Sequence, residues 1–287
     1  MSMKIQLSIP IVAGALFLSA CGGEEATNSD QPKVEVTVDD QAVSADEDFI
    51  LPQPISLAHA FKNAGLTYVS GKTNPISNKD KYSKKIDQLL NLGVYSTDLA
   101  YCAINNKTQE ARDYLSAVQS LGTKVGLESV FSDKSLIEKF DKNLGNQSAL
   151  EELIYDIQDK SDAYLQDNDL RYLAAVEFAG AWAEGMYLGI DDSRKNVKNM
   201  SIAIVDQMTL LRNTIKGLES HPSQDARLKT VIGMFRDVLT TYEGFESVKK
   251  AGKNVNFKAP ELTVEEFDAL SSKIVSLRNG IVSPAQK

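Results

Sequence analysis

Histidine, cysteine and tryptophan are scarce in this chain, which limits the chemistry that its 287 residues can perform. There are two histidines, His59 and His221, and neither lies in an HExxH or CxxC context. The sequence therefore gives no sign of a dedicated zinc site. Because histidine most often serves as general acid or base, the shortage also argues against a Ser-His-Asp grouping.

Motifs of the common hydrolases and nucleotide-binding proteins are absent as well. The chain has no Gly-x-Ser-x-Gly elbow, no P-loop and no GxGxxG sequence. Basic clusters are missing too, because nine acidic residues and one lysine between residues 21 and 48 account for the whole net charge of −8. From residue 49 onward the chain is nearly neutral, which argues against binding to nucleic acid.

What the sequence does contain begins with a short apolar N-terminal run. Lys4 precedes the mostly apolar residues 5–18, and small residues follow, which is the pattern of a cleaved signal peptide over residues 1–20. The run is too short to favour a membrane-spanning helix. Leu18-Ser19-Ala20-Cys21 resembles the lipobox of bacterial lipoproteins, which implies that Cys21 carries lipid and anchors the chain to a membrane. The alternative is an ordinary signal peptide with a coincidental cysteine.

Residues 21–48 form an acidic segment with little apolar sequence to bury, and we expect a disordered tether there. Glu24-Glu25 soon after the cysteine resembles a surface-export signal of Bacteroidota lipoproteins. Gly22 differs from the aspartate that retains many lipoproteins at the inner membrane. The expected location is therefore the outer membrane, on its periplasmic or cell-surface face.

The remainder, residues 49–287, has the spacing of long amphipathic helices and no convincing strand. Short breaks between these segments favour an all-α domain of about nine helices in stacked antiparallel hairpins. A pair of bundles divided between residues 144 and 148 is the alternative. The predicted helices span about residues 56–68, 80–104, 108–125, 133–144, 148–166, 169–188, 191–218, 228–245 and 263–281.

Several of these helices have recognisable start signals. Ser148-Ala149-Leu150-Glu151 and Thr263-Val264-Glu265-Glu266 each have the form of a capping box. Asp133, and either Asp191 or Asp192, can cap two further helices.

Two of the predicted helices carry polar side chains inside apolar sequence. In the first, Tyr95 and Tyr101 are each three residues from Asp98, so the three can share one side. In the second, Glu177 and Glu184 are seven residues apart, which places them on one face about two turns apart. The candidate binding or polar cluster is Tyr95, Asp98, Tyr101, Glu177, Trp182 and Glu184.

One hypothesis is that Asp98, Glu177 and Glu184 meet in the interior, where paired carboxylates serve acid–base catalysis or bind a cation. The alternative is that each carboxylate is satisfied by a hydroxyl, a basic side chain or the backbone, as buried carboxylates usually are. Trp182 is expected to be a packing anchor, unless exposed aromatic residues form a platform for a glycan.

Two stretches also resemble a family of uncharacterised helical lipoproteins from Bacteroidota. The first comprises Leu51-Pro52-Gln53-Pro54 and Phe61-Lys62-Asn63-Ala64-Gly65-Leu66. The second comprises Asn91-Leu92-Gly93-Val94-Tyr95-Ser96-Thr97-Asp98-Leu99-Ala100-Tyr101 and Gln109-Glu110. The resemblance covers about residues 50–127 and implies a cell type, but no activity and no catalytic residue.

Together these features predict a lipid-anchored protein of the cell envelope that acts as a non-catalytic binding or scaffold module. Its expected partners are the membrane, through lipid on Cys21, and an envelope protein. No cofactor, metal or nucleic acid is expected. The alternative is a hydrolase or a cation-binding protein that uses the interior carboxylates.

Overall fold

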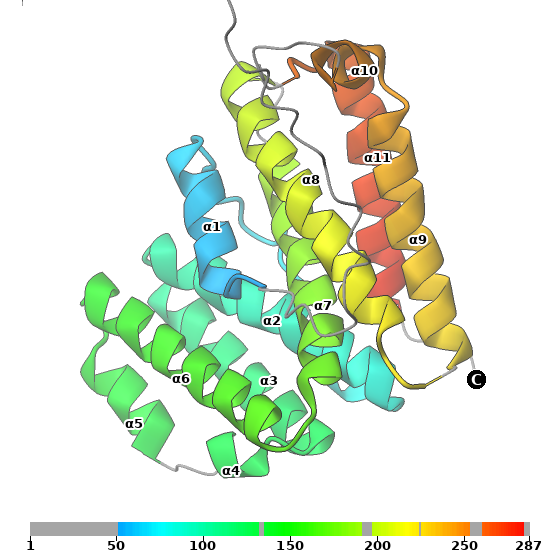
Figure 1. The fold of residues 1–287 in the computed structure, drawn as a ribbon. Coiled ribbons are helices and arrows are strands. Elements are labelled where there is room, and N and C mark those ends of the chain that lie inside the picture. The colour runs from blue at the N-terminus through cyan, green and yellow to red at the C-terminus, as the bar shows by residue number, and fades with distance from the viewer. Residues whose placement is uncertain (1–50, 132–134, 191–196, 224, 253–259, 284–287) are drawn as a thin grey trace, which may run out of the picture. The chain divides into compact units, whose positions relative to one another are not determined.

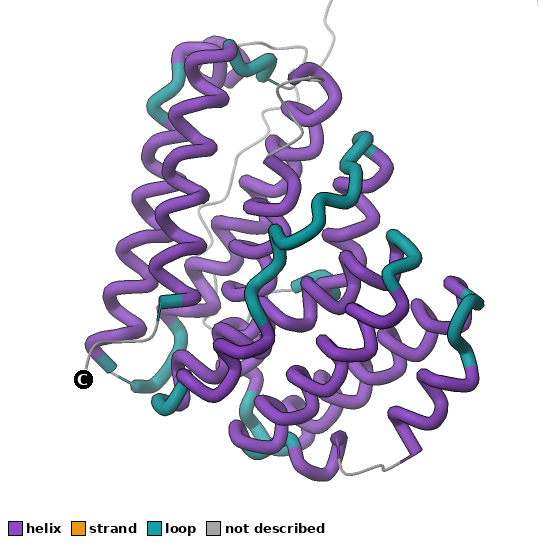
Figure 2. The backbone as a smooth tube through the Cα atoms, turned by 180° about the vertical axis from the view of Figure 1, so that it is seen from behind, coloured by secondary structure: helices purple, strands orange, loops and turns teal. Residues whose placement is uncertain are grey.

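A computed structural model describes residues 51–131, 135–190, 197–223, 225–252 and 260–283 of the chain. The signal peptide, Cys21 and the acidic tether predicted for residues 1–48 lie outside these residues, as do the caps predicted at Asp133 and at Asp191 or Asp192. The described part is all-helical, with eleven α-helices, one 3-10 helix and no strand (Figure 2). The predicted fold class is thus confirmed, although the predicted number of helices was too low.

Two buried helices form the centre of the fold, α2 (Lys85–Ile104) and α7 (Arg171–Ile190). They pack directly on each other, and α1 (Pro54–Asn63), α3 (Thr108–Val125), α6 (Gln147–Asp167) and α11 (Val264–Val282) all contact α2. In the sequence, α2 precedes residues 144–148 and α7 follows them, yet the two helices pack on each other. The described helices therefore do not divide into two bundles at that point (Figure 1).

Glycine permits the close approach of α2 and α7. A Cβ atom on Gly93 of α2 would overlap the backbone oxygen of Glu177, and one on Gly180 of α7 would overlap the backbone oxygen of Leu90. Only residues without a side chain allow two helix backbones to come this near. This contact fixes the register in which polar side chains of the two helices face each other.

A second layer of helices covers the other side of α7. It consists of α8 (Val197–Glu219), α9 (Ala226–Glu243) and α11, which pack against one another and run side by side in Figures 1 and 2. The side chains of residues 197–201 at the start of α8 are not described. Among the described helices, none is both long and apolar enough to cross a membrane.

Three short helices were not predicted from the sequence. They are the 3-10 helix η1 (Ile76–Lys81), α4 (Glu128–Phe131) and α10 (Glu246–Gly252). Periodicity cannot reveal them, because each spans two turns or fewer. A further short helix, α5 (Ser135–Lys142), lies within the predicted span 133–144.

The predicted capping boxes have different outcomes. Thr263 and Glu266 form the predicted box at the start of α11, with the Glu266 N–H donating to Thr263 Oγ1 at 3.2 Å. The box predicted at Ser148 is wrong, because α6 begins earlier and Asn146 caps it by accepting the N–H of Ala149. Asn and Ser are both favoured N-cap residues, so Asn146 and Ser148 were both possible caps for this helix, and Asn146 is the one used.

Candidate functional site

A buried ion pair joins α7 to α11. Arg278 donates from Nε to Glu184 Oε2 at 2.8 Å and from Nη2 to Oε1 at 3.0 Å. The Glu184 side chain is 0 % exposed and that of Arg278 is 9 % exposed. The guanidinium also lies 4.4 Å from the ring centroid of Tyr187. The two parallel hydrogen bonds satisfy the charge of Glu184 in an interior that would otherwise exclude it.

Asp98 of α2 lies next to this ion pair and interacts with both Glu184 and Arg278. The residue is fully buried, and its Oδ2 accepts the backbone N–H of Asn74 at 3.1 Å. Burial and the neighbouring Glu184 carboxylate raise the pKa of Asp98 well above its ordinary value, which the Arg278 guanidinium opposes only in part. Within the part of the chain that the structure describes, no group donates a hydrogen bond to Asp98 Oδ1. When protonated, it can donate to Glu184, so the two carboxyl groups form an acid–carboxylate pair.

Tyrosines around this pair hold the loop before η1 in place. Tyr95 donates to the backbone oxygen of Pro75 at 2.9 Å, and Tyr114 donates to Thr73 Oγ1 at 2.6 Å. Burial raises the pKa of both phenols, and the Asp98 carboxylate raises them further. They therefore remain neutral hydrogen-bond donors and brace the backbone that binds Asp98.

The two other aromatic candidates lie in the core. Tyr101 donates to the backbone oxygen of Thr67 at 3.1 Å and accepts the N–H of Val69 at 2.7 Å. Trp182 is 0 % exposed and donates from Nε1 to the backbone oxygen of Gln207 at 3.3 Å. A glycan platform needs exposed rings, and neither residue supplies one.

Glu177 does not join the carboxyl pair, which corrects the hypothesis that three carboxylates meet. It is half-buried on α7, and its carboxyl group faces Asp162 of α6. Burial and that neighbour raise the pKa of Glu177 to about 8. Seven residues of helix rise about 10 Å, so Asp98 reaches only one of the two glutamates. The described residues also contain no group of three or more side chains suited to holding a metal ion.

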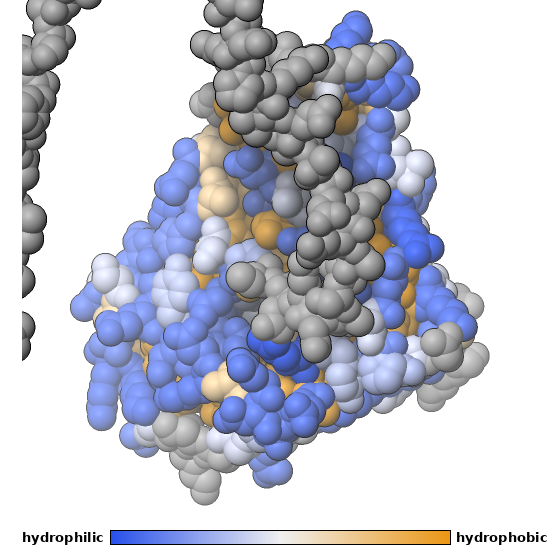
Figure 3. Space-filling view, in the orientation of Figure 1, coloured by the Kyte–Doolittle hydropathy of each residue, from blue (hydrophilic) through white to orange (hydrophobic). Residues whose placement is uncertain are grey.

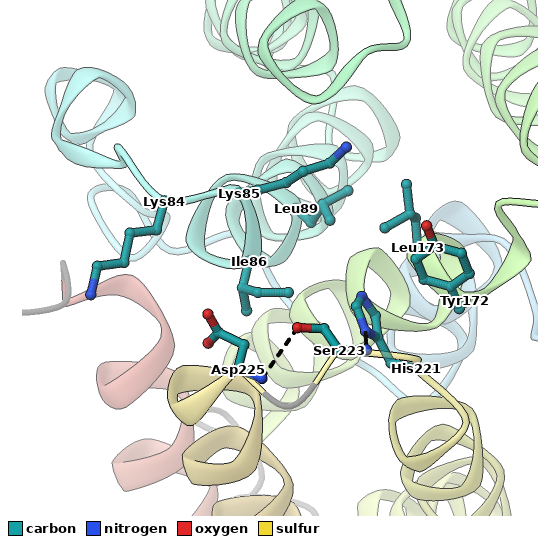
Figure 4. A pocket seen from close by; sticks show the side chains of 9 residues that line it. All are labelled: Lys84, Lys85, Ile86, Leu89, Tyr172, Leu173, His221, Ser223 and Asp225. Atoms are coloured by element: carbon teal, nitrogen blue, oxygen red, sulfur yellow. Dashed lines mark hydrogen bonds between the residues drawn. The ribbon is translucent and has the colours of Figure 1, made fainter.

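A separate pocket of about 440 Å³ opens at the N-terminal end of α2 (Figure 4). The first turn of α2 forms one wall, the start of α7 another, and the segment between α8 and α9 the third. Its lining residues are Lys84, Lys85, Ile86, Leu89, Tyr172, Leu173, His221, Ser223 and Asp225. A volume of this size suits a small molecule.

His221 contributes an unusual group to this pocket. Its Nδ1 accepts the backbone N–H of Ser223 at 3.0 Å, and burial lowers the pKa of the imidazole, so the ring is neutral and carries its proton on Nε2. Nε2 is buried and has no partner among the described residues, although the ring packs edge-on with Tyr172, with ring centroids 4.7 Å apart. A buried donor without an acceptor costs about 1–3 kcal/mol.

This pocket was not predicted from the sequence. His221 stood there only as an isolated histidine, because the lining residues come from three segments that are far apart in the chain. The two adjacent lysines before an apolar helix were the only local signal.

Comparison with known proteins adds no assignment. No family model, no curated protein and no solved structure matches the chain. The resemblance to helical lipoproteins of Bacteroidota therefore stays a prediction from the sequence.

Proposed function

We propose that this chain is a lipid-anchored protein of the bacterial cell envelope whose helical domain binds a ligand or partner without catalysis. The anchor rests on Leu18-Ser19-Ala20-Cys21 and the acidic residues that follow. In this proposal the lipid on Cys21 attaches the chain to the outer membrane, on its periplasmic or cell-surface face. The resemblance to Bacteroidota lipoproteins is consistent with that placement.

The proposal that the domain is not catalytic rests on the complete burial of Asp98 and Glu184. A catalytic carboxyl group must reach its substrate, whereas both of these side chains are 0 % exposed. The bidentate bonds from Arg278 give Glu184 a structural partner on a third helix. The same geometry suits a network that joins α2, α7 and α11.

Two concave sites on the described surface could hold a ligand. Besides the pocket at α2, a groove of about 420 Å³ lies between α4, α5 and α6. Val130, Leu136 and Ile157 supply its apolar part, and Lys139 and Lys160 lie at its sides. Figure 3 shows apolar residues reaching the surface among mostly hydrophilic ones on the face it draws.

The anchor is tested by labelling cells with an alkyne fatty acid and separating their membranes. We expect the wild-type chain to carry the label and to sediment with membranes. Cys21→Ser should lose the label and enter the soluble fraction. Cys102→Ala is the matched control, because Cys102 is a buried free cysteine and its loss should leave labelling intact. Equal labelling of Cys21→Ser would overturn the proposed anchor.

The binding role is tested by capture from detergent-solubilised membranes with the anchored chain as bait. Recovery of a stoichiometric envelope protein that is lost without Cys21 would support a scaffold. If no such protein is recovered, the scaffold role is contradicted, and the proposed binding function is restricted to small ligands.

A hydrolase or cation-binding protein is the second candidate, and Asp98 Oδ1 is the observation that favours it. This oxygen has no partner while ionised, and it lies beside a second carboxylate. Calcium titration with the melting temperature as readout separates the two. A cation site predicts a rise in melting temperature that a chelator reverses, whereas a structural acid–carboxylate pair predicts no change.

A further inference from the structure

Three side chains of α2 fasten the loop between α1 and η1 to one side of that helix. Asp98 accepts the backbone N–H of Asn74 at 3.1 Å. Tyr95 and Tyr101, one helical turn before and after it, bind backbone atoms of the same loop through their hydroxyl groups. Because the three side chains are three residues apart, they form a row along α2 that holds residues 67–75, which we call the strap.

The strap lies between the buried charged groups and solvent. Two of its residues, Lys72 and Asn74, are buried, whereas residues 69–71 are exposed. Lys72 Nζ lies 5.0 Å from the ring centroid of Tyr187, and the Arg278 guanidinium lies 4.4 Å from the same centroid. The inner side of the strap therefore contacts Asp98 through one residue and the surroundings of the ion pair through another.

The buried groups under the strap need a proton to stay sealed. Arg278 binds both oxygens of Glu184, and no described group donates a hydrogen bond to Asp98 Oδ1. Two adjacent carboxyl groups beside one guanidinium leave a negative charge without compensation unless one of them is protonated. A buried charge of this kind is costly, because the interior solvates it poorly. The closed strap therefore suits a protonated Asp98, whereas the ionised carboxylate requires water.

The carboxyl pair is the part of this cluster that changes charge near neutral pH. Phenols and thiols are ordinarily neutral there, and lysine and arginine are ordinarily charged. Burial raises the pKa of Tyr95, Tyr114 and Cys102 still further. The titratable groups around Asp98 are Tyr95 and Cys102 on α2, Lys72 and Tyr82 before it, Tyr114 on α3, Glu184 and Tyr187 on α7, and Arg278 on α11.

We propose that the strap is a cover controlled by one proton, closed while Asp98 is protonated and open once Asp98 is ionised. Opening admits water to Asp98, Glu184 and Arg278 and turns a sealed cluster into an accessible charged site. The close backbone contact at Gly93 holds α2 against α7, so the strap moves and the helices do not. This device goes beyond the proposed binding role and depends neither on a ligand nor on the lipid at Cys21.

Hydrogen exchange at the Asn74 amide measures this opening, because its N–H is the one bonded to Asp98. The full chain, labelled with ¹⁵N and purified in a non-ionic detergent, is transferred to deuterated buffer and followed by NMR. The readout is the protection factor, the intrinsic exchange rate divided by the observed rate. Because opening releases a proton, the protection factor should fall by up to about tenfold per pH unit between about pH 5 and about pH 7. It should also stay below that of amides in the middle of α2.

Three variants make the test specific to the carboxyl pair. Asp98→Asn imitates the protonated acid, so the protection of Asn74 should be the same at both pH values. Glu184→Gln removes the neighbouring carboxylate and should also abolish the pH dependence, which provides a second test if one variant fails to fold. Tyr101→Phe is the matched control, because it removes the bond to the Val69 N–H and leaves the carboxyl pair intact. It should lower the protection of Val69 at both pH values and keep the pH dependence at Asn74.

Three results would overturn the proposal. The first is a wild-type protection factor at Asn74 that does not change with pH. The second is an equal fall in Asp98→Asn and wild type, because the proton would then come from another group. The third is protection at Asn74 as high as in the middle of α2, because the strap would then open only when the whole domain unfolds.

Discussion

Two regions of α2, its middle and its N-terminal end, differ in how their polar groups are paired. In the middle of α2, Asp98 is buried beside the Glu184–Arg278 ion pair, and the three residues come from three different helices. At the N-terminal end of α2, Lys84, Lys85 and His221 line an open pocket, and Nε2 of His221 has no partner among the described residues. Satisfied polar groups hold helices together, whereas unsatisfied ones at a concave surface are free to bind a ligand. The same helix thus contributes to a buried ion-pair network and to the wall of an open pocket.

The largest expected effect tests the sealed site. Arg278→Met leaves the Glu184 carboxylate buried without its partner and should lower the free energy of unfolding by about 3–5 kcal/mol. The measurement is urea unfolding followed by far-UV circular dichroism. Adding Glu184→Leu removes the stranded charge and should restore most of the loss, because an apolar pair can replace a buried ion pair.

An exposed ion pair provides the control for that experiment. Arg212 donates from Nη2 to Glu243 Oε1 at 2.8 Å, with side chains that are 45 % and 49 % exposed. Glu243→Gln should cost at most about 1 kcal/mol. If Arg278→Met cost no more than this surface change, the pair would not be a structural element of the core.

The second prediction concerns the approach of α2 and α7 that makes the sealed site. Gly93→Ala places a methyl group against the backbone oxygen of Glu177 and should cost about 3 kcal/mol, because neither backbone can yield easily. Gly233→Ala on α9 has open space around the added methyl group and should instead stabilise the chain by about 0.5–1 kcal/mol. Thermal melting of both variants gives the comparison, and a loss of similar size in both would contradict it.

The sequence predicted much of the architecture and little of either site. Long periodic segments gave helices close to their true bounds, and 108–125 coincides with α3. The box at Thr263 followed from local chemistry alone. Arg278, however, lies 94 residues from Glu184, and no local sequence pattern predicts that the two residues pair. The hypothesis that Glu177 and Glu184 both meet Asp98 could not be tested from the sequence, because the register of α2 against α7 depends on the glycine contact between them.

The third prediction is a pH dependence that comes from Asp98. Its pKa is raised in the folded chain, so folding holds a proton that the unfolded chain releases above about pH 3.9. Stability should therefore fall as the pH rises from that value towards the folded-state pKa, with a slope approaching about 1.4 kcal/mol per pH unit. Asp98→Asn mimics the protonated acid and should remove this component.

The difference in unfolding free energy between wild type and Asp98→Asn isolates the effect of that one group. Urea unfolding at about pH 5 and about pH 7 should show that the unfolding free energy of the variant increases relative to that of the wild type as the pH rises. A difference that stayed constant with pH would mean that Asp98 is ionised in the folded chain, and the acid–carboxylate pair would have to be abandoned.

The smallest expected effect tests the open site. Lys84→Gln with Lys85→Gln should change the unfolding free energy, measured by urea unfolding, by less than about 0.5 kcal/mol, because both lysines are exposed. A loss as large as that expected for Arg278→Met would mean that the N-terminal end of α2 is also a structural element of the core.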